Sequence, residues 1–312
     1  MAAAAIVLVL LGTAIVLRSS DEADAAAPTQ TAGPDSVRLL RTMSVLAHDS
    51  MAGRGTGTIQ NAHARSFLLA ELQGLGAESG SSGYEQPFTW GSGAGTNVVG
   101  RIPGTERAST IVLTAHFDHV GVRDGEIYNG ADDNASGTAA VLEIARLVAE
   151  APLQSSLVVA LLDAEEVGLR GARAFVEEPP VELSGEVLNV NLDMVSRSGG
   201  VLWASGAHHT PALRPVLERV AAVAPVTLRL GHDRPDAPEG SDWTNSSDHG
   251  PFHSAGFPFV YFGVENHPDY HRPTDDVERV NPEEFVHSVR TILMAIRALD
   301  QALPFPSTGA PR

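Results

Sequence analysis

The chain has no cysteine among its 312 residues. Disulfide bonds, thiolate metal ligands and a cysteine nucleophile are therefore excluded. Several catalytic signatures are also missing. The chain lacks the G-x-S-x-G elbow of α/β serine hydrolases, the H-E-x-x-H pair of thermolysin-like zinc sites, and the glycine patterns of P-loop and dinucleotide-binding folds. These absences argue against an α/β serine hydrolase, a thermolysin-like zinc site and a P-loop or dinucleotide-binding site.

Positive charge is scarce: 21 Lys and Arg against 38 Asp and Glu give a formal net charge of 21 − 38 = −17. An acidic surface repels phosphate groups, so we expect no nucleic-acid binding. The same acidity also suits an ordinary soluble protein that its charge keeps dispersed. With 43% hydrophobic and 19% charged residues, the composition is that of a globular chain and not of a disordered one.

The chain opens on an uncharged run, Ala2 to Leu17, which is shorter than the roughly 20 apolar residues of a membrane span. Arg18 and a polar stretch follow, with small residues of the A-x-A kind between Ala23 and Ala26. No Lys or Arg precedes the run. We expect residues 1–25 to be a signal peptide or an N-terminal membrane anchor. The protein is then exported: secreted, periplasmic, or anchored to the outer side of the cytoplasmic membrane.

A linker is predicted at 26–35, one catalytic domain at 36–303 and a tail at 304–312. Short apolar runs of the parallel-strand type alternate with amphipathic, helix-type patterns. The predicted strands are 111–115, 157–162, 187–192, 201–204, 226–230 and 257–262. The predicted helices are 36–47, 62–75, 136–149, 169–177, 211–223 and 282–302. This alternation indicates an α/β fold: a mostly parallel mixed sheet flanked by helices on both faces.

In such sheets ligands bind beyond the carboxyl ends of the strands, and acidic and histidine residues follow several predicted strands here. They are His116, Asp118, Asp132, Asp133, Asp163, Glu165, Glu166, Asp193 and His271. Packing so many like charges together without a cation is costly. Zinc takes histidine nitrogen and carboxylate oxygen, and a catalytic site leaves one position open. Each residue also has an ordinary interpretation, such as a helix cap for Asp132 or Asp133; together they indicate a metal site.

Six segments in order resemble the M28 family of zinc peptidases, of the aminopeptidase Y and leucyl aminopeptidase type. They are TAHFDHVG (114–121), YNGADDNASGTAAVLEIAR (128–146), LLDAEEVGLRGA (161–172), NLDMV (191–195), SSDHGPF (246–252) and YHRPTDD (270–276). The upstream MAGRGTGT (51–58) is similar to the family's leader. The resemblance covers roughly 43–302 and implies a zinc-dependent exopeptidase fold with two zinc ions per chain.

The resemblance also implies a role for each matching residue. Asp132 would bridge the two metals, with a cis peptide bond to Asp133. Glu166 and His271 would complete one metal site, while His116 and Asp193 would complete the other. Asp118 would orient the imidazole of His116, and Asp275 would do the same near His271. His119 and the other loop histidines are not expected to bind metal.

The implied activity is that of an aminopeptidase acting on peptides with a free N-terminus. Two metals about 3.5–4 Å apart would share a water. Glu165 would take the proton of that water as it attacks the scissile carbonyl, then pass the proton to the leaving amine. Tyr270 is the candidate donor to the oxyanion. A carboxypeptidase, a glutaminyl cyclase and a non-catalytic binding domain of the same fold are the alternatives.

Overall fold

The computed structural model describes Met1 and residues 33–106, 109–238 and 240–305. The described residues from 33 to 305 form one compact unit. The predicted leader at 1–25 and most of the predicted linker and tail fall on residues that the structure does not describe, so they stay predictions. Within the described ranges, no helix has both the length and the apolar character needed to cross a membrane.

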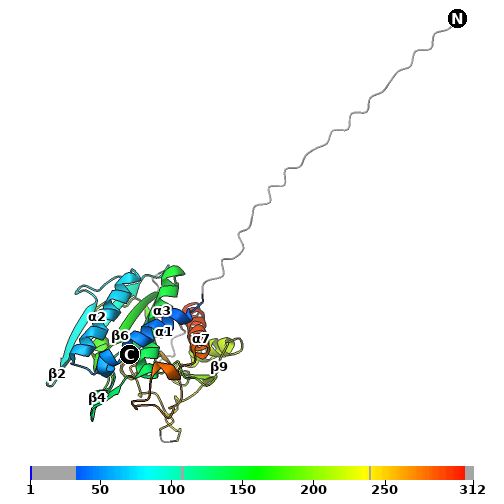
Figure 1. Ribbon diagram of the computed structural model, residues 1–312. Helices are drawn as coiled ribbons and strands as arrows, with labels where there is room; N and C mark the ends of the chain where they lie inside the picture. Colours follow the sequence, from blue (N-terminus) through cyan, green and yellow to red (C-terminus); the bar gives the residue numbers. More distant parts are fainter. Residues whose placement is uncertain (2–32, 107–108, 239, 306–312) are drawn as a thin grey trace. The chain divides into compact units, whose positions relative to one another are not determined.

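The described residues form an eight-stranded mixed sheet in the order β1-β2-β6-β3-β7-β10-β8-β9. Figure 1 labels β2, β6 and β9 of this sheet. Its central strands β6, β3, β7 and β10 run parallel, β8 and β9 are parallel to each other, and β1, β2 and β8 form the antiparallel pairings. The strands are β1 (Glu85–Trp90), β2 (Gly93–Ile102), β3 (Ser109–His116), β6 (Ser156–Leu162), β7 (Glu186–Leu192), β8 (Val201–Ser205), β9 (Thr227–Leu230) and β10 (Phe259–Gly263). A separate hairpin pairs β4 (Gly121–Arg123) with β5 (Glu126–Tyr128). The predicted α/β fold with a mostly parallel mixed sheet is confirmed.

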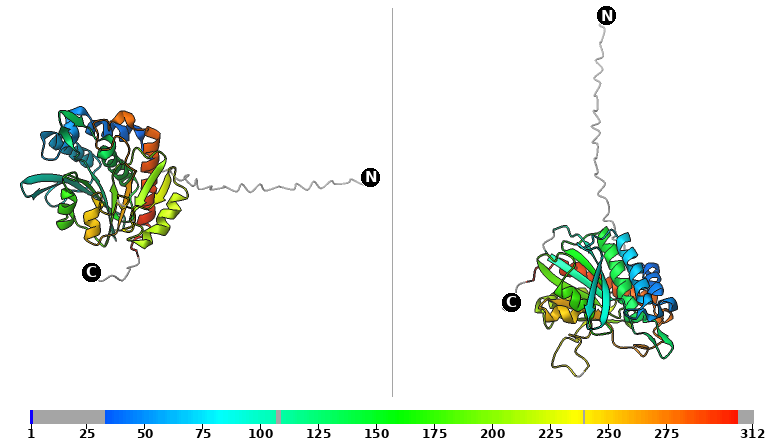
Figure 2. Two further views of the ribbon diagram at one scale, coloured as in Figure 1. Left: turned by 90° about the horizontal axis from the view of Figure 1, so that it is seen from below. Right: turned by 90° about the vertical axis from the view of Figure 1, so that its left-hand side faces the viewer.

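Helices cover both faces of this sheet (Figure 2). One face packs against α1 (Ser36–Leu46), α2 (Ile59–Gly74), α3 (Gly137–Glu150), α5 (Arg214–Ala221) and α7 (Pro282–Asp300). The other packs against α4 (Arg170–Glu177) and α6 (His249–Ser254). Short helical turns complete the connections: η1 (Asp49–Arg54), η2 (Ala131–Ser136), η3 (Pro211–Leu213) and η4 (Val277–Arg279).

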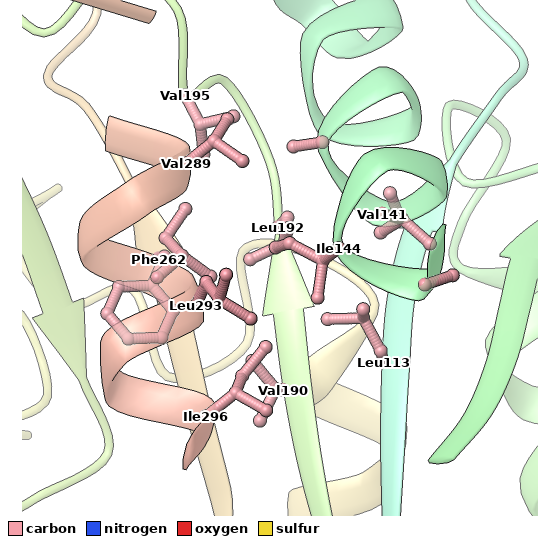
Figure 3. Packing of buried hydrophobic residues seen from close by; sticks show 14 of the residues in the cluster. Leu113, Val141, Ile144, Val190, Leu192, Val195, Phe262, Val289, Leu293 and Ile296 are labelled. Carbon is pink, nitrogen blue, oxygen red and sulfur yellow. The ribbon is translucent and has the colours of Figure 1, made fainter. Parts of the chain in front are cut away.

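The two cores follow from the two-residue period of a strand. In β6, Leu157, Val159 and Leu161 belong to the larger core, whereas Val158 and Ala160 point to the smaller one. Both faces are thus apolar, which explains the unbroken hydrophobic runs of the central strands. Figure 3 shows the larger core, where side chains of α3 and α7 meet those of β7 and β10. This packing fixes the strand ends that carry the polar residues.

Arg54 is fully buried and joins the end of α1 to two loops near those strand ends. Its guanidinium donates to the carbonyl oxygens of Phe117 at 2.8 Å, Leu46 at 2.7 Å, Asn129 at 2.5 Å and Gly130 at 3.0 Å. Burial lowers its pKa to about 10, although carboxylates nearby favour the charged form. A planar fork with five donors suits this task as no other side chain does.

Arg54→Lys is expected to lower the free energy of unfolding by about 2–4 kcal/mol. One ammonium group cannot reach all four carbonyl oxygens, and each buried carbonyl left without a donor costs about 1–3 kcal/mol. Urea unfolding monitored by circular dichroism measures the change. Arg234→Lys, on an exposed loop, is the matched control and should leave stability unchanged. Equal unfolding free energies for Arg54→Lys and the parent protein would contradict this role.

Candidate metal centre

The parallel strands deliver their polar residues to one edge of the sheet. His116 ends β3, Glu165 and Glu166 follow β6, Asp193 follows β7, and His271 lies in the loop after β10. Because β6, β3, β7 and β10 are parallel neighbours, these carboxyl ends lie side by side. The structure therefore brings together the histidines and carboxylates that the sequence placed after successive strands.

Asp133 lies between two groups of these side chains and offers one oxygen to each. Its Oδ1 is 3.5 Å from Nε2 of His116. Its Oδ2 is 3.0 Å from Nε2 of His271 and 3.8 Å from Nδ1 of His119. A carboxylate divided in this way has the geometry needed to hold two cations.

The first group consists of His119, Asp133, Glu166 and His271, whose ligand atoms all lie within 4.8 Å of one another. Hydrogen bonds with Asp133 and Glu166 raise the pKa of His271 to about 10. Burial opposes ionisation of Glu166, but the imidazoles of His119 and His271 hold the pKa of its carboxyl far below the usual range. His119 was not predicted as a member of this group.

The second group consists of His116, Glu165 and Asp193, again with ligand atoms within 4.8 Å of one another. Nε2 of His116 is 3.5 Å from Oδ1 of Asp193. Burial disfavours protonation of His116, but the carboxylates of Asp193 and Glu165 raise its pKa well above the ordinary value. Burial raises the pKa of Glu165 well above that of a solvated glutamate.

The structure corrects the prediction for Asp132. Its Oδ1 accepts hydrogen bonds from the backbone N–H of Ser196 at 2.8 Å and from the Ser196 hydroxyl at 2.6 Å, and its Oδ2 lies 3.2 Å from Nε2 of His267. These contacts keep the Asp132 carboxylate out of both groups. Asp133, the next residue, lies between the two groups, where Asp132 was predicted to lie. The cis peptide bond is likewise one residue further along, between Asp133 and Asn134.

Neighbouring side chains fix η2, and with it Asp133, against the segment that follows β7. Asn134 donates to the carbonyl of Leu192 and accepts from the N–H of Met194. The hydroxyl of Ser136 accepts from the N–H of Val195. Since Asp193 lies within this segment, the same contacts set the distance between Asp133 and Asp193.

The carboxylates of Asp118 and Asp275, which were predicted to orient histidine rings, accept hydrogen bonds mainly from backbone N–H groups. Nδ1 of His116 is 3.1 Å from the main-chain oxygen of Asp118 and 3.7 Å from its carboxylate. That carboxylate accepts from the N–H groups of Glu165 at 3.0 Å and Glu166 at 3.3 Å. Asp118 thus contacts His116 mainly through its main-chain carbonyl, while its carboxylate positions the two glutamates; the orienting role of that carboxylate stays a prediction.

Asp275 differs from its prediction in the same way. Its carboxylate accepts from the backbone N–H groups of Asp132 and Asp133 at 3.0–3.2 Å, so it anchors η2 and not the ring of His271. Arg197 lies 3.9 Å from this carboxylate and 3.0 Å from Nδ1 of His267. The ring of Tyr270 stacks on His271 with 4.1 Å between centroids, and burial raises the pKa of its hydroxyl. The donor role of Tyr270 stays a prediction.

The residues present fit a pair of metal ions by their unmet polar atoms. Among the described residues, several buried polar atoms have no hydrogen-bond partner, and four of them belong to these two groups: Nδ1 and Nε2 of His119, Oε1 of Glu166 and Oδ1 of Asp193. Native proteins rarely leave such atoms unpaired without an ion, a water or a function. Histidine nitrogen and carboxylate oxygen are ligands that zinc accepts. The edge of the sheet is therefore suited to divalent metal.

Asp248 adds a further buried carboxyl beside the second group. It precedes α6, is fully buried, and neither of its oxygens has a hydrogen-bond partner among the described residues. Burial raises its pKa to about 8, although His116 works in the opposite direction. Between the ordinary pKa and pH 8 the folded chain thus binds more protons here than the unfolded chain, so stability falls as pH rises through this window.

When the pH is raised from 5 to 8, we expect the melting temperature of the metal-free parent protein to fall by several °C more than that of the Asp248→Asn variant. A change of one kcal/mol in the free energy of unfolding moves the midpoint of a domain of this size by about 2–4 °C. Calorimetric scans in the presence of chelator give the difference at each pH. Asp236→Asn, on the exposed Arg234 loop, is the control. A difference between parent and Asp248→Asn that does not change with pH would contradict the assignment.

The sheet and the histidine–carboxylate groups at its edge define an α/β protein with a metal-binding site at its strand ends. Residues 97–296 match the family description "Peptidase family M28", and the chain belongs to this family. The resemblance that the sequence motifs predicted is confirmed.

Curated relatives agree with the family. The chain is 30% identical over 196 residues to aminopeptidase YwaD of Bacillus subtilis, covering 60% of this chain and 40% of that protein. It is 28% identical over 246 residues to leupeptin-inactivating enzyme 1 of Streptomyces exfoliatus, covering 77% of this chain and 51% of that protein. The matches thus span about half the length of these relatives.

Solved structures confirm the fold. The zinc aminopeptidase BSAP of Bacillus subtilis superposes with a TM-score of 0.66 at 17% identity, covering 84% of this chain and 94% of that one. Glutaminyl cyclase of Porphyromonas gingivalis superposes with a TM-score of 0.70 at 20% identity, covering 86% of this chain and 99% of that one. The shared fold thus accommodates both kinds of protein.

Proposed function

We propose that this protein is a di-zinc aminopeptidase that hydrolyses the N-terminal peptide bond of its substrates. The observation that carries the proposal is the divided carboxylate of Asp133, with one oxygen toward His116 and the other toward His271. Asp133, Glu166 and His271 would hold one ion, and Asp133, His116 and Asp193 would hold the other. Zinc, when bound, supplies Lewis acidity and lowers the pKa of water toward neutrality.

Glu165 is the general base in this proposal. Its carboxylate lies beside His116 and Asp193. Its backbone N–H donates to the carboxylate of Asp118 at 3.0 Å, which fixes the backbone of Glu165. It accepts the proton of the attacking water and returns it to the nitrogen of the departing amine. Tyr270, stacked on His271, donates its hydroxyl hydrogen to the oxygen of the scissile carbonyl as negative charge develops there.

The acidic surroundings support a substrate with a free, protonated α-amino group. Glu165, Glu166 and Asp193 belong to the two groups at this edge of the sheet, and a carboxylate there that is not itself a zinc ligand, such as that of Glu165, would attract an ammonium group. The relative YwaD and the neighbour BSAP both carry the name aminopeptidase. We propose an exported location as well, since one relative is the probable lipoprotein aminopeptidase LpqL of Mycobacterium tuberculosis, 37% identical over 102 residues.

The test measures zinc and activity on the same purified protein. We expect two zinc ions per chain and release of p-nitroaniline from aminoacyl-p-nitroanilides that stops with chelator and returns with zinc. N-acetylated substrates should not react, because the α-amino group is blocked. Glutaminyl cyclase is the second candidate, on the likeness to the Porphyromonas gingivalis structure. Ammonia release from N-terminal glutamine peptides, with one zinc and no p-nitroaniline, would replace the aminopeptidase proposal with that one.

A further inference from the structure

His119 is a buried imidazole without a hydrogen-bonding role. It lies three residues after His116, in the loop between β3 and β4, and is almost fully buried. Neither ring nitrogen has a hydrogen-bond partner among the described residues. Nδ1 lies 2.7 Å from Oε1 of Glu166, yet this contact does not meet hydrogen-bond geometry, because the ring nitrogen does not point at that oxygen. A buried ring in this state requires another partner.

The backbone opposite His119 leaves room for its ring. A Cβ added at Gly130 would lie 2.4 Å from Cδ2 and 2.6 Å from Cγ of His119, and Gly130 itself has a φ of +57°. Any residue other than glycine would therefore displace the ring and strain the turn that leads into Asp133. The ring of His119 is thus held against the same backbone that presents the Asp133 carboxylate.

Distances within the first group match the edges of a metal tetrahedron. Ligands about 2.1 Å from a tetrahedral zinc lie about 3.4 Å from one another. The four ligand-atom distances of this group that join a histidine to a carboxylate are 2.7, 3.0, 3.4 and 3.8 Å. Their mean lies close to the ideal edge. His119 therefore occupies the fourth corner beside Asp133, Glu166 and His271.

We propose that His119 is a fourth protein ligand and that it makes the two metal positions unequal. This inference rests on the proposed two-zinc function. The position held by His119, Asp133, Glu166 and His271 has a full set of protein ligands, which is the arrangement of a tightly held, structural zinc. The position held by His116, Asp193 and the shared Asp133 has three, which leaves a place for water or substrate.

The location of the general base agrees with this division. Glu165 belongs to the group of His116 and Asp193, not to the group of His119. Glu165 thus lies beside the metal position that has only three protein ligands. The four-ligand position fixes Asp133 and the loop of His271, and the three-ligand position is where the substrate carbonyl and the water meet.

Zinc titration and zinc X-ray absorption on the parent protein, His119→Ala and His119→Asn test the proposal. The parent protein should bind two zinc ions in two steps of different affinity, with three imidazoles shared between them. Both variants should lose one imidazole from the absorption spectrum, and their tight step should weaken about tenfold or more. His63→Ala, an exposed histidine of α2, is the control and should match the parent protein.

His119→Asn separates a ligand from a hydrogen-bond donor, because asparagine keeps an N–H group near the position of Nδ1. Restored affinity in His119→Asn, or an unchanged imidazole count in either variant, would overturn the inference and leave the two-zinc proposal standing. A parent protein that binds fewer than two zinc ions would overturn both.

Discussion

Glu165→Gln is expected to lower kcat by about 10²–10⁴-fold while both zinc ions stay bound. The amide has nearly the shape of the carboxylate but cannot accept the proton of the attacking water, and general-base catalysis contributes an effect of about this size. Zinc content by mass spectrometry and kcat on an aminoacyl-p-nitroanilide give the two quantities. The acid limb of the pH–rate profile should disappear with the base, which a merely structural substitution would not cause.

The position of Glu165 makes this experiment informative in a second way. Its carboxylate lies within reach of the same ion as His116 and Asp193, so geometry alone allows it to be a ligand. Loss of one zinc in Glu165→Gln would assign it that role, whereas full activity would remove it from the mechanism. Glu150→Gln, at the exposed end of α3, is the control and should retain parental kcat and zinc.

The central strands were predictable because burial on both faces leaves a plain signal in sequence. The runs at 157–162 and 187–192 match β6 and β7 to within one residue, since a strand covered on both faces is apolar at every position. The hairpin β1–β2 was missed. β1 alternates exposed and half-buried residues, and β2 mixes glycine with polar residues, so neither shows an apolar run.

The site residues after strands were predictable for a related reason. His116, Glu165, Glu166, Asp193 and His271 all come together at one edge, because parallel strands share the direction of their carboxyl ends. His119 carried a signal that could have been used: it follows His116 by three residues in the same strand-end loop. Loop histidines are usually ordinary, and only the fold reveals that Gly130 leaves room for this ring.

The choice between Asp132 and Asp133 could not be made from spacing. Both are buried acidic residues in one turn, and a difference of one residue reverses the direction of a side chain wherever the backbone is extended. Asp133 has φ −102° and ψ 97°, an extended conformation, and Asn134 after it is also non-helical, so the turn is interrupted at these two residues. This local geometry turns the Asp133 carboxylate toward the two groups and leaves the Asp132 carboxylate facing Ser196 and His267.

Asp133→Ala is therefore expected to lose zinc and nearly all activity, because one carboxylate contributes to both metal positions. Asp132→Asn is the matched comparison: it changes the neighbouring residue and should keep two zinc ions. We expect Asp132→Asn to lower kcat moderately, since the amide still accepts from the Ser196 N–H but no longer bears the charge that faces His267. Zinc counted after gel filtration, beside kcat for both variants, measures the contrast.

The contrast between the two variants also tests how the site is held together. Asp133 touches both groups directly, whereas Asp132 acts only through Ser196 and His267, which flank the segments of Asp193 and His271. If Asp132→Asn loses zinc while Asp133→Ala keeps it, the carboxylate shared by the two ions is Asp132 and the geometry of η2 must differ in the metal-bound protein. If zinc is lost only from Asp133→Ala, Asp133 is the residue on which both metal positions depend.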